Sequence, residues 1–145
     1  MLKENITDIR KERHKKTQED FTPDSVLRIL CPEDNDPLYF DFSKTLVDPC
    51  MGNGNIILYV YKKRLENTKI QKDVELALST LYGVELMQDN VDEFYDRLKE
   101  LLQEKYTDEI DKIAHHNFVG GVDSLNDWDF DNWKFKTKNT TKKLF

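Results

Sequence analysis

The sequence predicts an α/β fold, a partial doubly wound parallel sheet of about three strands with flanking helices. Two observations support this prediction. Short apolar strand-like stretches alternate with amphipathic helical stretches, and a turn with two glycines, "DPCMGNGN" at 48–55, lies between the first strand and the next helix. Such alternation builds a parallel sheet with right-handed crossovers. About three strands is fewer than the five or six typical of these sheets.

The first half of the chain supplies a helix, a loop, a strand and a second helix. A helix is expected at 22–30, with Thr22 as its cap, Pro23 in its first turn, and Val26, Leu27 and Leu30 on one face. Two prolines that bracket acids predict a loop at 31–37. A strand is expected within 38–48, with its last part, "TLV", buried, and helical spacing of apolar residues predicts a helix at 54–66.

The second half repeats the alternation. We expect a helix at 70–81, a short buried strand, "YGVEL", at 82–86, and the clearest helix of the chain at 88–106, with Asp89 near its start. A last helical segment is predicted at 107–116. The stretch "NFVGGVDSL" at 117–125 then predicts a third strand or strand-like segment.

The 145 residues allow one compact domain with a modest core, and their net charge of -6 is distributed unevenly. Residues 1–16 hold six Lys/Arg against three acids, and 134–143 hold five Lys and no acid. Eleven Lys/Arg and twenty-five Asp/Glu lie between them, a net charge of -14. We therefore expect a basic segment at 1–19, a folded domain at 20–133 and a basic tail at 134–145. An acidic body makes a poor stand-alone DNA binder, because phosphate contact needs a positive face.

The cysteines and the lengths of the apolar stretches bear on the cellular compartment of the protein. Cys31 and Cys50 do not resemble a disulfide framework, which favours a reducing environment. No apolar stretch is long enough for a signal peptide or a membrane span. A cytoplasmic location and no membrane partner are therefore expected.

The glycine turn raises the question of a ligand, although two glycines alone often serve only the backbone. Glu85 ends the second strand about thirty residues after the turn, where nucleotide-type sites place an acid that accepts hydrogen bonds from two ribose hydroxyls. Asp48 directly precedes the turn, where a carboxylate repels a pyrophosphate but suits an ammonium or sulfonium. The Lys-Ser/Thr ending of a phosphate-binding P-loop is absent. A positively charged adenosyl ligand, S-adenosylmethionine, fits these features best.

Four stretches extend this interpretation to a family: "FTPDSVLRIL", "VDPCMGNGNIIL", "LYGVELMQDNVDEFYDRL" and "HNFVGGVDSLNDWDFDNW". In order and spacing they resemble the S-adenosylmethionine-binding part of adenine-specific DNA methyltransferases, of the kind found in restriction-modification systems and phages. The resemblance covers roughly residues 17–133, and it implies a Rossmann-like methyltransferase sheet. The second and third stretches are the most specific.

The resemblance implies a role for each matching residue. The methionine moiety would be flanked by Phe21, Thr22 and Pro23. Its amino acid end would be held by Asp48 and by the backbone of Pro49, Cys50, Gly52 and Gly54. Around the adenosine, Glu85 would take the ribose hydroxyls, Leu86 or Met87 would lie against one adenine face, Asp123 would accept the adenine amino group, and Leu125 would pack on the ring.

Each of these residues, taken alone, also has a plain structural interpretation. Thr22 and Pro23 then form a simple helix cap, Glu85 is an exposed strand-end acid, and Asp123 is a turn residue.

The catalytic part of the family pattern is not found. In the family an Asp/Asn-Pro-Pro-Tyr/Phe segment after the fourth strand holds the flipped adenine and accepts hydrogen bonds from its amino group. Here "DWDFDNWKF" is followed by "KTKNTTKKLF", and none of the four prolines are adjacent. The look-alike "DPLY" at 36–39 lies upstream of the glycine turn, where a proline-rich loop explains it. No catalytic residue is assigned.

Other chemistries find little support. His115 and His116 are adjacent, so they point in different directions and make a poor metal pair. Trp128 and Trp133 could stack on bases or pack as anchors, and the acids between them favour packing. No metal site is expected.

Two functions remain open. The first is a methyltransferase-type protein whose base pocket comes from a partner chain or another surface. The second is a non-catalytic cofactor-binding or protein-interaction module of a phage or restriction-modification system. An acidic DNA mimic is a third idea, which the basic ends disfavour. Expected partners are S-adenosylmethionine, a protein or second copy at the open edge of the "TLV" strand, and DNA only weakly or through a partner.

Overall fold

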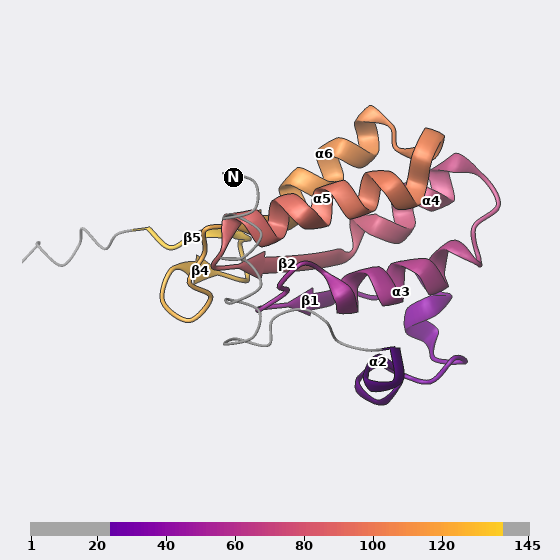
Figure 1. Ribbon diagram of the computed structural model, residues 1–145, viewed down its shortest axis with the longest axis horizontal. Coiled ribbons are helices and arrows are strands. Elements are labelled where there is room, and N and C mark those ends of the chain that lie inside the picture. The colour runs from indigo at the N-terminus through magenta and orange to yellow at the C-terminus, as the bar shows by residue number, and fades with distance from the viewer. Residues whose placement is uncertain (1–23, 138–145) are drawn as a thin grey trace, which may run out of the picture.

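The structure is a computed structural model, which describes residues 24–137. Strands β1 (Leu46–Asp48), β2 (Leu81–Glu85) and β3 (Phe118–Gly120) form a parallel sheet in the order β1-β2-β3 (Figure 1). The helices are α2 (Asp24–Leu30), η1 (Pro37–Tyr39), α3 (Asn55–Leu65), α4 (Gln71–Ser79), α5 (Gln88–Leu102), η2 (Gln103–Lys105) and α6 (Asp108–Asn117). The predicted α/β class with a three-stranded parallel sheet is confirmed. No helix within 24–137 is long and apolar enough to cross a membrane.

Some element boundaries and burial predictions need correction. The helix predicted at 88–106 ends at Leu102, because Gln103 has a positive φ of 52° that breaks the helical path. The third strand is shorter than predicted, since Gly121 turns the chain with φ +73° directly after Gly120. The "TLV" strand is not buried: Val47 is 40% exposed, because β1 is an edge strand.

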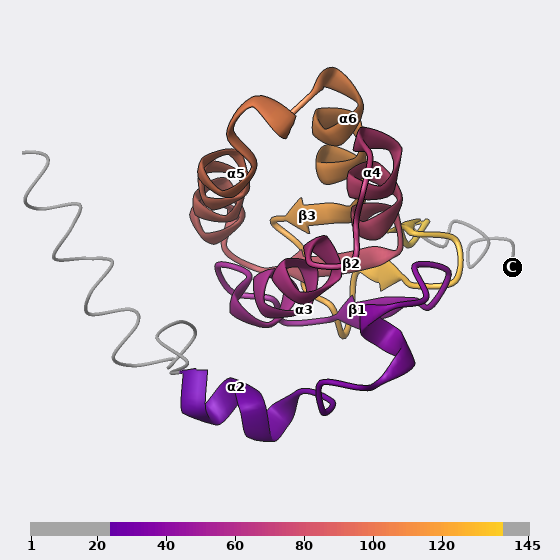
Figure 2. The same ribbon diagram turned by 90° about the vertical axis from the view of Figure 1, so that its right-hand side faces the viewer.

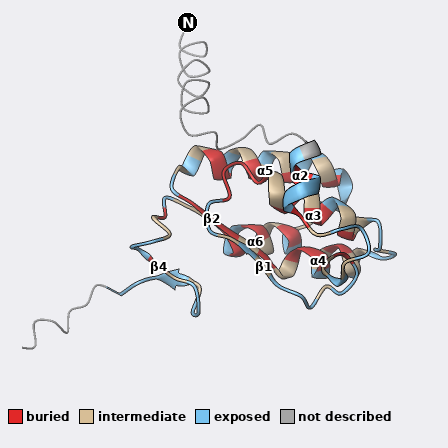
Figure 3. Cartoon of the chain, turned by 90° about the horizontal axis from the view of Figure 1, so that it is seen from below, coloured by how far each residue is buried: buried red, intermediate tan, exposed pale blue. Residues whose placement is uncertain are grey.

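Different parts of the chain pack against the two faces of the sheet. Side chains alternate along a strand, so Leu81 of β2 and Phe118 of β3 face the main core, which α3, α4, α5 and α6 complete. Figure 2 shows these helices packed against the sheet, and Figure 3 shows the buried residues along them. Val84 points to the other face, into a small cluster with Val122 and Trp128. The described helices therefore leave that second face to the C-terminal segment.

A short hairpin that the sequence patterns do not predict covers part of the second face. β4 (Trp128–Asp129) pairs antiparallel with β5 (Lys134–Phe135). Trp128 is buried, and the Trp133 indole donates a hydrogen bond to the His116 carbonyl at 2.8 Å. The Trp133 ring also packs on Tyr82 of β2, with centroids 4.9 Å apart. The predicted packing role of the two tryptophans is confirmed.

One buried arginine fixes the starts of β1 and β2. The Arg64 guanidinium of α3 donates to the carbonyls of Leu38, Lys44 and Ala77 and to the Thr80 hydroxyl, at 2.7 to 2.9 Å. Lys44 precedes β1 and Thr80 precedes β2, so one side chain holds both strand entries. Burial lowers the pKa of the Arg64 guanidinium, and the four acceptors offset the cost of desolvating its charge.

The N-terminal part of the described chain packs less closely. Of the predicted apolar face of α2, only Leu27 is buried, while Val26 and Leu30 are exposed. Phe21, Thr22 and Pro23 lie outside the described residues, and so does the predicted helix cap.

Candidate functional site

Three of the predicted site segments come together at one edge of the sheet. The carboxyl ends of parallel strands lie side by side, and the register pairs Asp48 with Gly83 and Glu85 with Gly120. The segments that follow the three strands, 48–54, 85–87 and 121–125, therefore begin at the same edge (Figure 1). A hydrogen bond from the Val122 amide to the Glu85 carbonyl, 3.0 Å long, joins the second and third of them.

The glycine loop is a buried, sharply turned segment. Met51, Gly52 and Gly54 are buried, and the Met51 amide donates to the Val84 carbonyl of β2 at 3.0 Å. Gly52 and Gly54 have φ of 56° and 88°, in the left-handed region that favours glycine. A Cβ at Gly54 would also overlap the ring of Phe94 on α5. Gly54 is therefore required both by its backbone conformation and by close packing. Of the other predicted residues of this loop, Pro49 and Cys50 are exposed.

Glu85 is bonded directly to this loop. Its Oε1 accepts from the Gly52 amide at 3.0 Å, and its Oε2 accepts from the Met87 amide at 3.0 Å and from the Asn90 side chain at 3.3 Å. Glu85 is 6% exposed, so the interpretation as an exposed strand-end acid is wrong. A carboxylate offers about four acceptor positions. To accept two ribose hydroxyls, Glu85 would have to release at least one of its present donors.

Asp48 supplies a second carboxylate beside the first. Its Oδ1 accepts from the Cys50 amide at 3.1 Å. Burial raises the pKa of the Asp48 carboxyl, and the charge of Glu85 raises it further. Within residues 24–137 neither Asp48 nor Glu85 forms a salt bridge. A bound cation would therefore stabilise the ionised pair.

Helix α5 holds the outer side of the loop by hydrogen bonds that no sequence pattern predicts. Nη1 of Arg97 donates to the Asn53 carbonyl at 3.0 Å and to Oδ1 of Asn55 at 2.8 Å. The Asn53 side chain donates to Glu93 at 2.6 Å. Glu93 and Arg97 are four residues apart on α5, next to the apolar Phe94. This spacing is the one sequence feature that could have indicated their role. Their partners lie 40 to 44 residues away, so no local pattern reveals the contact.

The residues expected around adenine lie at the same edge but are more open. Leu86 and Leu125 are 63% and 85% exposed, and Met87 is half-buried. Asp123 closes its own turn: Oδ1 accepts from the Leu125 amide at 3.1 Å, and Oδ2 accepts from the Asn126 side chain at 2.9 Å. These hydrogen bonds lower the pKa of Asp123. Asp123 thus has the geometry of a turn residue.

The "DPLY" segment is structural, as its interpretation as a loop predicts. Asp36 caps η1 by accepting from the Leu38 amide at 2.8 Å. Tyr39 is 1% exposed, and its hydroxyl donates to the Pro32 carbonyl at 2.6 Å. A buried ring in this position offers no face to a base.

The two histidines within the described residues, His115 and His116, lie in the last turn of α6, away from the glycine loop. Both are exposed, and the His115 ring stacks on Tyr95 with centroids 4.3 Å apart. Among residues 24–137 no group of three or more His, Cys, Asp or Glu side chains is arranged to hold a metal ion.

Comparison with protein-family models, curated proteins and solved structures gave no match. Chemically, the carboxyl edge of the sheet offers paired carboxylates, a buried glycine loop and the N-terminus of α3, a combination that suits a ligand with both positive and negative groups.

Proposed function

We propose that this chain binds S-adenosylmethionine at the carboxyl edge of its sheet, as the cofactor-binding part of a DNA adenine methyltransferase-type protein. The observation that carries the proposal is the 3.0 Å hydrogen bond between the Gly52 amide and Glu85. The glycine loop and the strand-end acid were predicted as two parts of one site from segments 33 residues apart. Their direct contact at the edge where α/β folds bind ligands supports that pairing.

Charge supports this ligand over a nucleotide with phosphates. Asp48 and Glu85 present carboxylates without a described salt-bridge partner. The sulfonium and ammonium of S-adenosylmethionine would be attracted to them, whereas a pyrophosphate would be repelled. The methionine carboxylate has a suitable neighbour in the N-terminus of α3, which Gly54 caps without a side-chain hydrogen bond.

The adenosine half would engage groups that are already close to Glu85. The ribose hydroxyls would replace a donor such as the Asn90 side chain, whose bond to Glu85 is the longest of the three at 3.3 Å. Either the exposed side chain of Leu86 or the half-buried Met87 would lie against one face of the adenine. Asp123 and Leu125 would complete the pocket once their turn closes on the ligand.

Calorimetric titration with S-adenosylmethionine tests the proposal. We expect one site, with Glu85→Ala weakening binding by about 1 to 3 kcal/mol through unpaired hydroxyls, and Gly54→Val abolishing it by steric block. Far-UV circular dichroism checks that each variant is folded. The absence of heat for the wild type, or unchanged affinity in both folded variants, contradicts the proposal.

We further propose that the chain alone does not methylate duplex DNA. No two of its four prolines are adjacent, so the sequence contains no Asn-Pro-Pro-Tyr-like segment to hold a flipped adenine. The base pocket would come from a partner chain or another surface. Incubation with labelled cofactor and mixed DNA measures methyl transfer by the chain alone. Strong label in adenine would contradict the proposal that the chain lacks a base pocket, but it would support the resemblance to methyltransferases.

A non-catalytic interaction module is the second candidate, and the open edge of β1 favours it. Leu46 donates its amide to the Thr80 carbonyl, so Leu46 faces β2, and the N–H and C=O of Val47 point the other way. Among the described residues no strand pairs there. A protein partner or a second copy in the cytoplasm would complete the sheet. Binding of a partner by a chain that shows no heat with S-adenosylmethionine would favour this candidate.

A further inference from the structure

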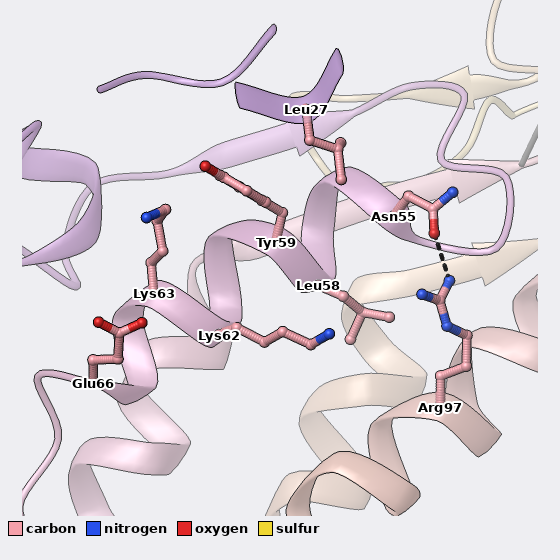
Figure 4. A pocket seen from close by; sticks show the side chains of 8 residues that line it. All are labelled: Leu27, Asn55, Leu58, Tyr59, Lys62, Lys63, Glu66 and Arg97. Carbon is pink, nitrogen blue, oxygen red and sulfur yellow. Dashed lines mark hydrogen bonds between the residues drawn. The ribbon is translucent and has the colours of Figure 1, made fainter. Parts of the chain in front are cut away.

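A groove of about 360 Å³ lies on the outer side of α3, between α2 and α5 (Figure 4). Its apolar part is formed by Leu27, Leu58 and Tyr59. Asn55, the first residue of α3 after the glycine loop, lines one end, and Arg97 of α5 stands beside it. The groove is thus next to the glycine loop but outside the carboxylate pair at the sheet edge.

Three cationic side chains line this groove: Lys62, Lys63 and Arg97. Figure 4 shows Lys62 extended along it towards Arg97, while Glu66 lies at the other end beside Lys63. Lys63 is paired with Asp34 at 2.7 Å, so its charge is balanced. Lys62 forms no salt bridge with any residue in 24–137. Two positive groups that face one space repel each other unless an anion lies between them.

Arg97 is held in position with hydrogen-bond donors to spare. Both of its described hydrogen bonds, to the Asn53 carbonyl and to Oδ1 of Asn55, use Nη1. A guanidinium carries five N–H donors in a planar fork that matches two oxygens of one phosphate. Because Nη1 is anchored, the orientation of the fork is set before any ligand arrives. Within the described chain, Nε and Nη2 remain available to an acceptor.

We propose that this groove binds a phosphoryl group, with Arg97 as its bidentate ligand and Lys62 as its second cation. The apolar surface of Leu27, Leu58 and Tyr59 suits the organic part of a phosphate ester. Either a free phosphate compound or the backbone of a nucleic acid presents this chemistry. The site would be coupled to the glycine loop, because the guanidinium that binds the phosphoryl group also holds the Asn53 carbonyl.

The test is an amide NMR titration of the full chain with inorganic phosphate and, separately, with a short single-stranded oligodeoxynucleotide. We expect shifts at Asn55, Tyr59, Lys62 and Arg97. Lys62→Gln should weaken binding at least about tenfold, since it removes a charge-assisted hydrogen bond. Lys72→Gln, at an exposed lysine of α4 that does not line the groove, is the matched control and should change nothing.

The two probes separate the possible ligands. Saturable shifts with both, or with phosphate alone, support a site for small phosphate compounds, and shifts with the oligonucleotide alone support a nucleic-acid backbone. Arg97→Lys keeps the charge but loses the fork, so it should weaken binding as Lys62→Gln does. Arg97→Lys also disturbs the loop, but Lys62→Gln does not. No groove shifts with either probe, or equal affinities of Lys62→Gln and Lys72→Gln, overturns the proposal.

Discussion

The glycine loop and the Asp123 turn follow strands at the same edge of the sheet, and both are predicted to contact one ligand, yet they are built differently. The loop is buried from Met51 to Gly54 and is bonded to Glu85, 33 residues from Gly52. The turn at 123–126 is closed by hydrogen bonds between residues two or three positions apart, and Leu125 is 85% exposed.

This difference separates preorganised parts of the candidate site from adaptable ones. Changing the loop disturbs contacts with β2 and α5, so it should affect stability and ligand binding together. Changing the turn removes contacts that water can replace, so it should affect binding alone. A ligand that uses both regions would find the methionine side ready and would order the adenine side as it binds.

The largest expected change in stability comes from glycine-to-alanine substitutions at Gly54 and Gly121, each of which has a left-handed backbone conformation. Gly54→Ala should lower the free energy of unfolding by about 3 kcal/mol, because the new Cβ overlaps Phe94 in addition to straining the backbone. Gly121→Ala adds the same kind of strain where no atom lies within 4 Å, and should cost about 1 kcal/mol. Urea denaturation measures both, and equal losses would contradict the packing argument.

Two acids give the next contrast. Glu85→Ala leaves the buried Gly52 amide and the half-buried Met87 amide without their acceptor, and should lower the free energy of unfolding by about 2 kcal/mol. Asp123→Ala frees donors that reach water, so the urea midpoint should hardly move. Equal destabilisation of the Asp123 and Glu85 variants would contradict this contrast, because the turn would then contribute as much to stability as the glycine loop.

The pH dependence of stability should have opposite signs for Asp48, at the end of β1, and Asp123, in the turn after β3. Burial raises the pKa of Asp48 above its unfolded value, so the folded state holds that proton more tightly and ionised Asp48 costs stability at neutral pH. Hydrogen bonds from the Asn126 side chain and the Leu125 amide lower the pKa of Asp123, so its contribution, which is small because this carboxyl is exposed, is present above the unfolded pKa and is lost as the pH falls through the folded pKa.

Asp48→Asn should therefore raise the urea midpoint at pH 7, and the gain should shrink as the pH is lowered into the carboxyl range. The same variant should bind S-adenosylmethionine about tenfold more weakly, because it removes the charge that we propose attracts this cationic ligand. Urea denaturation at several pH values measures the change in stability, and calorimetric titration measures the change in affinity for S-adenosylmethionine. A variant that is both less stable and equally able to bind would contradict the assigned role of Asp48.

The smallest effect concerns the edge of β1, which borders the loop. We expect weak self-association or partner docking there, because Val47 is 40% exposed and no described strand pairs with its outward backbone groups. Light scattering at several concentrations should show association that Val47→Lys reduces, and the Val47 amide should exchange more slowly as concentration rises. A strict monomer with a rapidly exchanging Val47 amide rules out both self-association and a covered edge.

Local patterns in the sequence predict most of the fold. Apolar spacing locates α3 to α6, and the glycine turn and Glu85 are brought to one sheet edge as expected. The hairpin at 128–135 is missed because its strands are two residues each, too short for any periodicity. Arg64 and Arg97 lie in charged stretches typical of solvated faces, and their acceptors lie 13 to 44 residues away. Contacts at such separations depend on tertiary packing, which no local pattern encodes.

An amide NMR titration of the labelled chain with S-adenosylmethionine tests the central claim most directly, because it locates the ligand as well as detecting it. We expect saturable shifts in three separate segments, 50–54, 85–87 and 121–126, with line broadening confined to the last segment as the turn becomes ordered. Shifts that avoid the first two segments, or none at ligand concentrations in the millimolar range, would contradict the claim that these strand ends form one S-adenosylmethionine site.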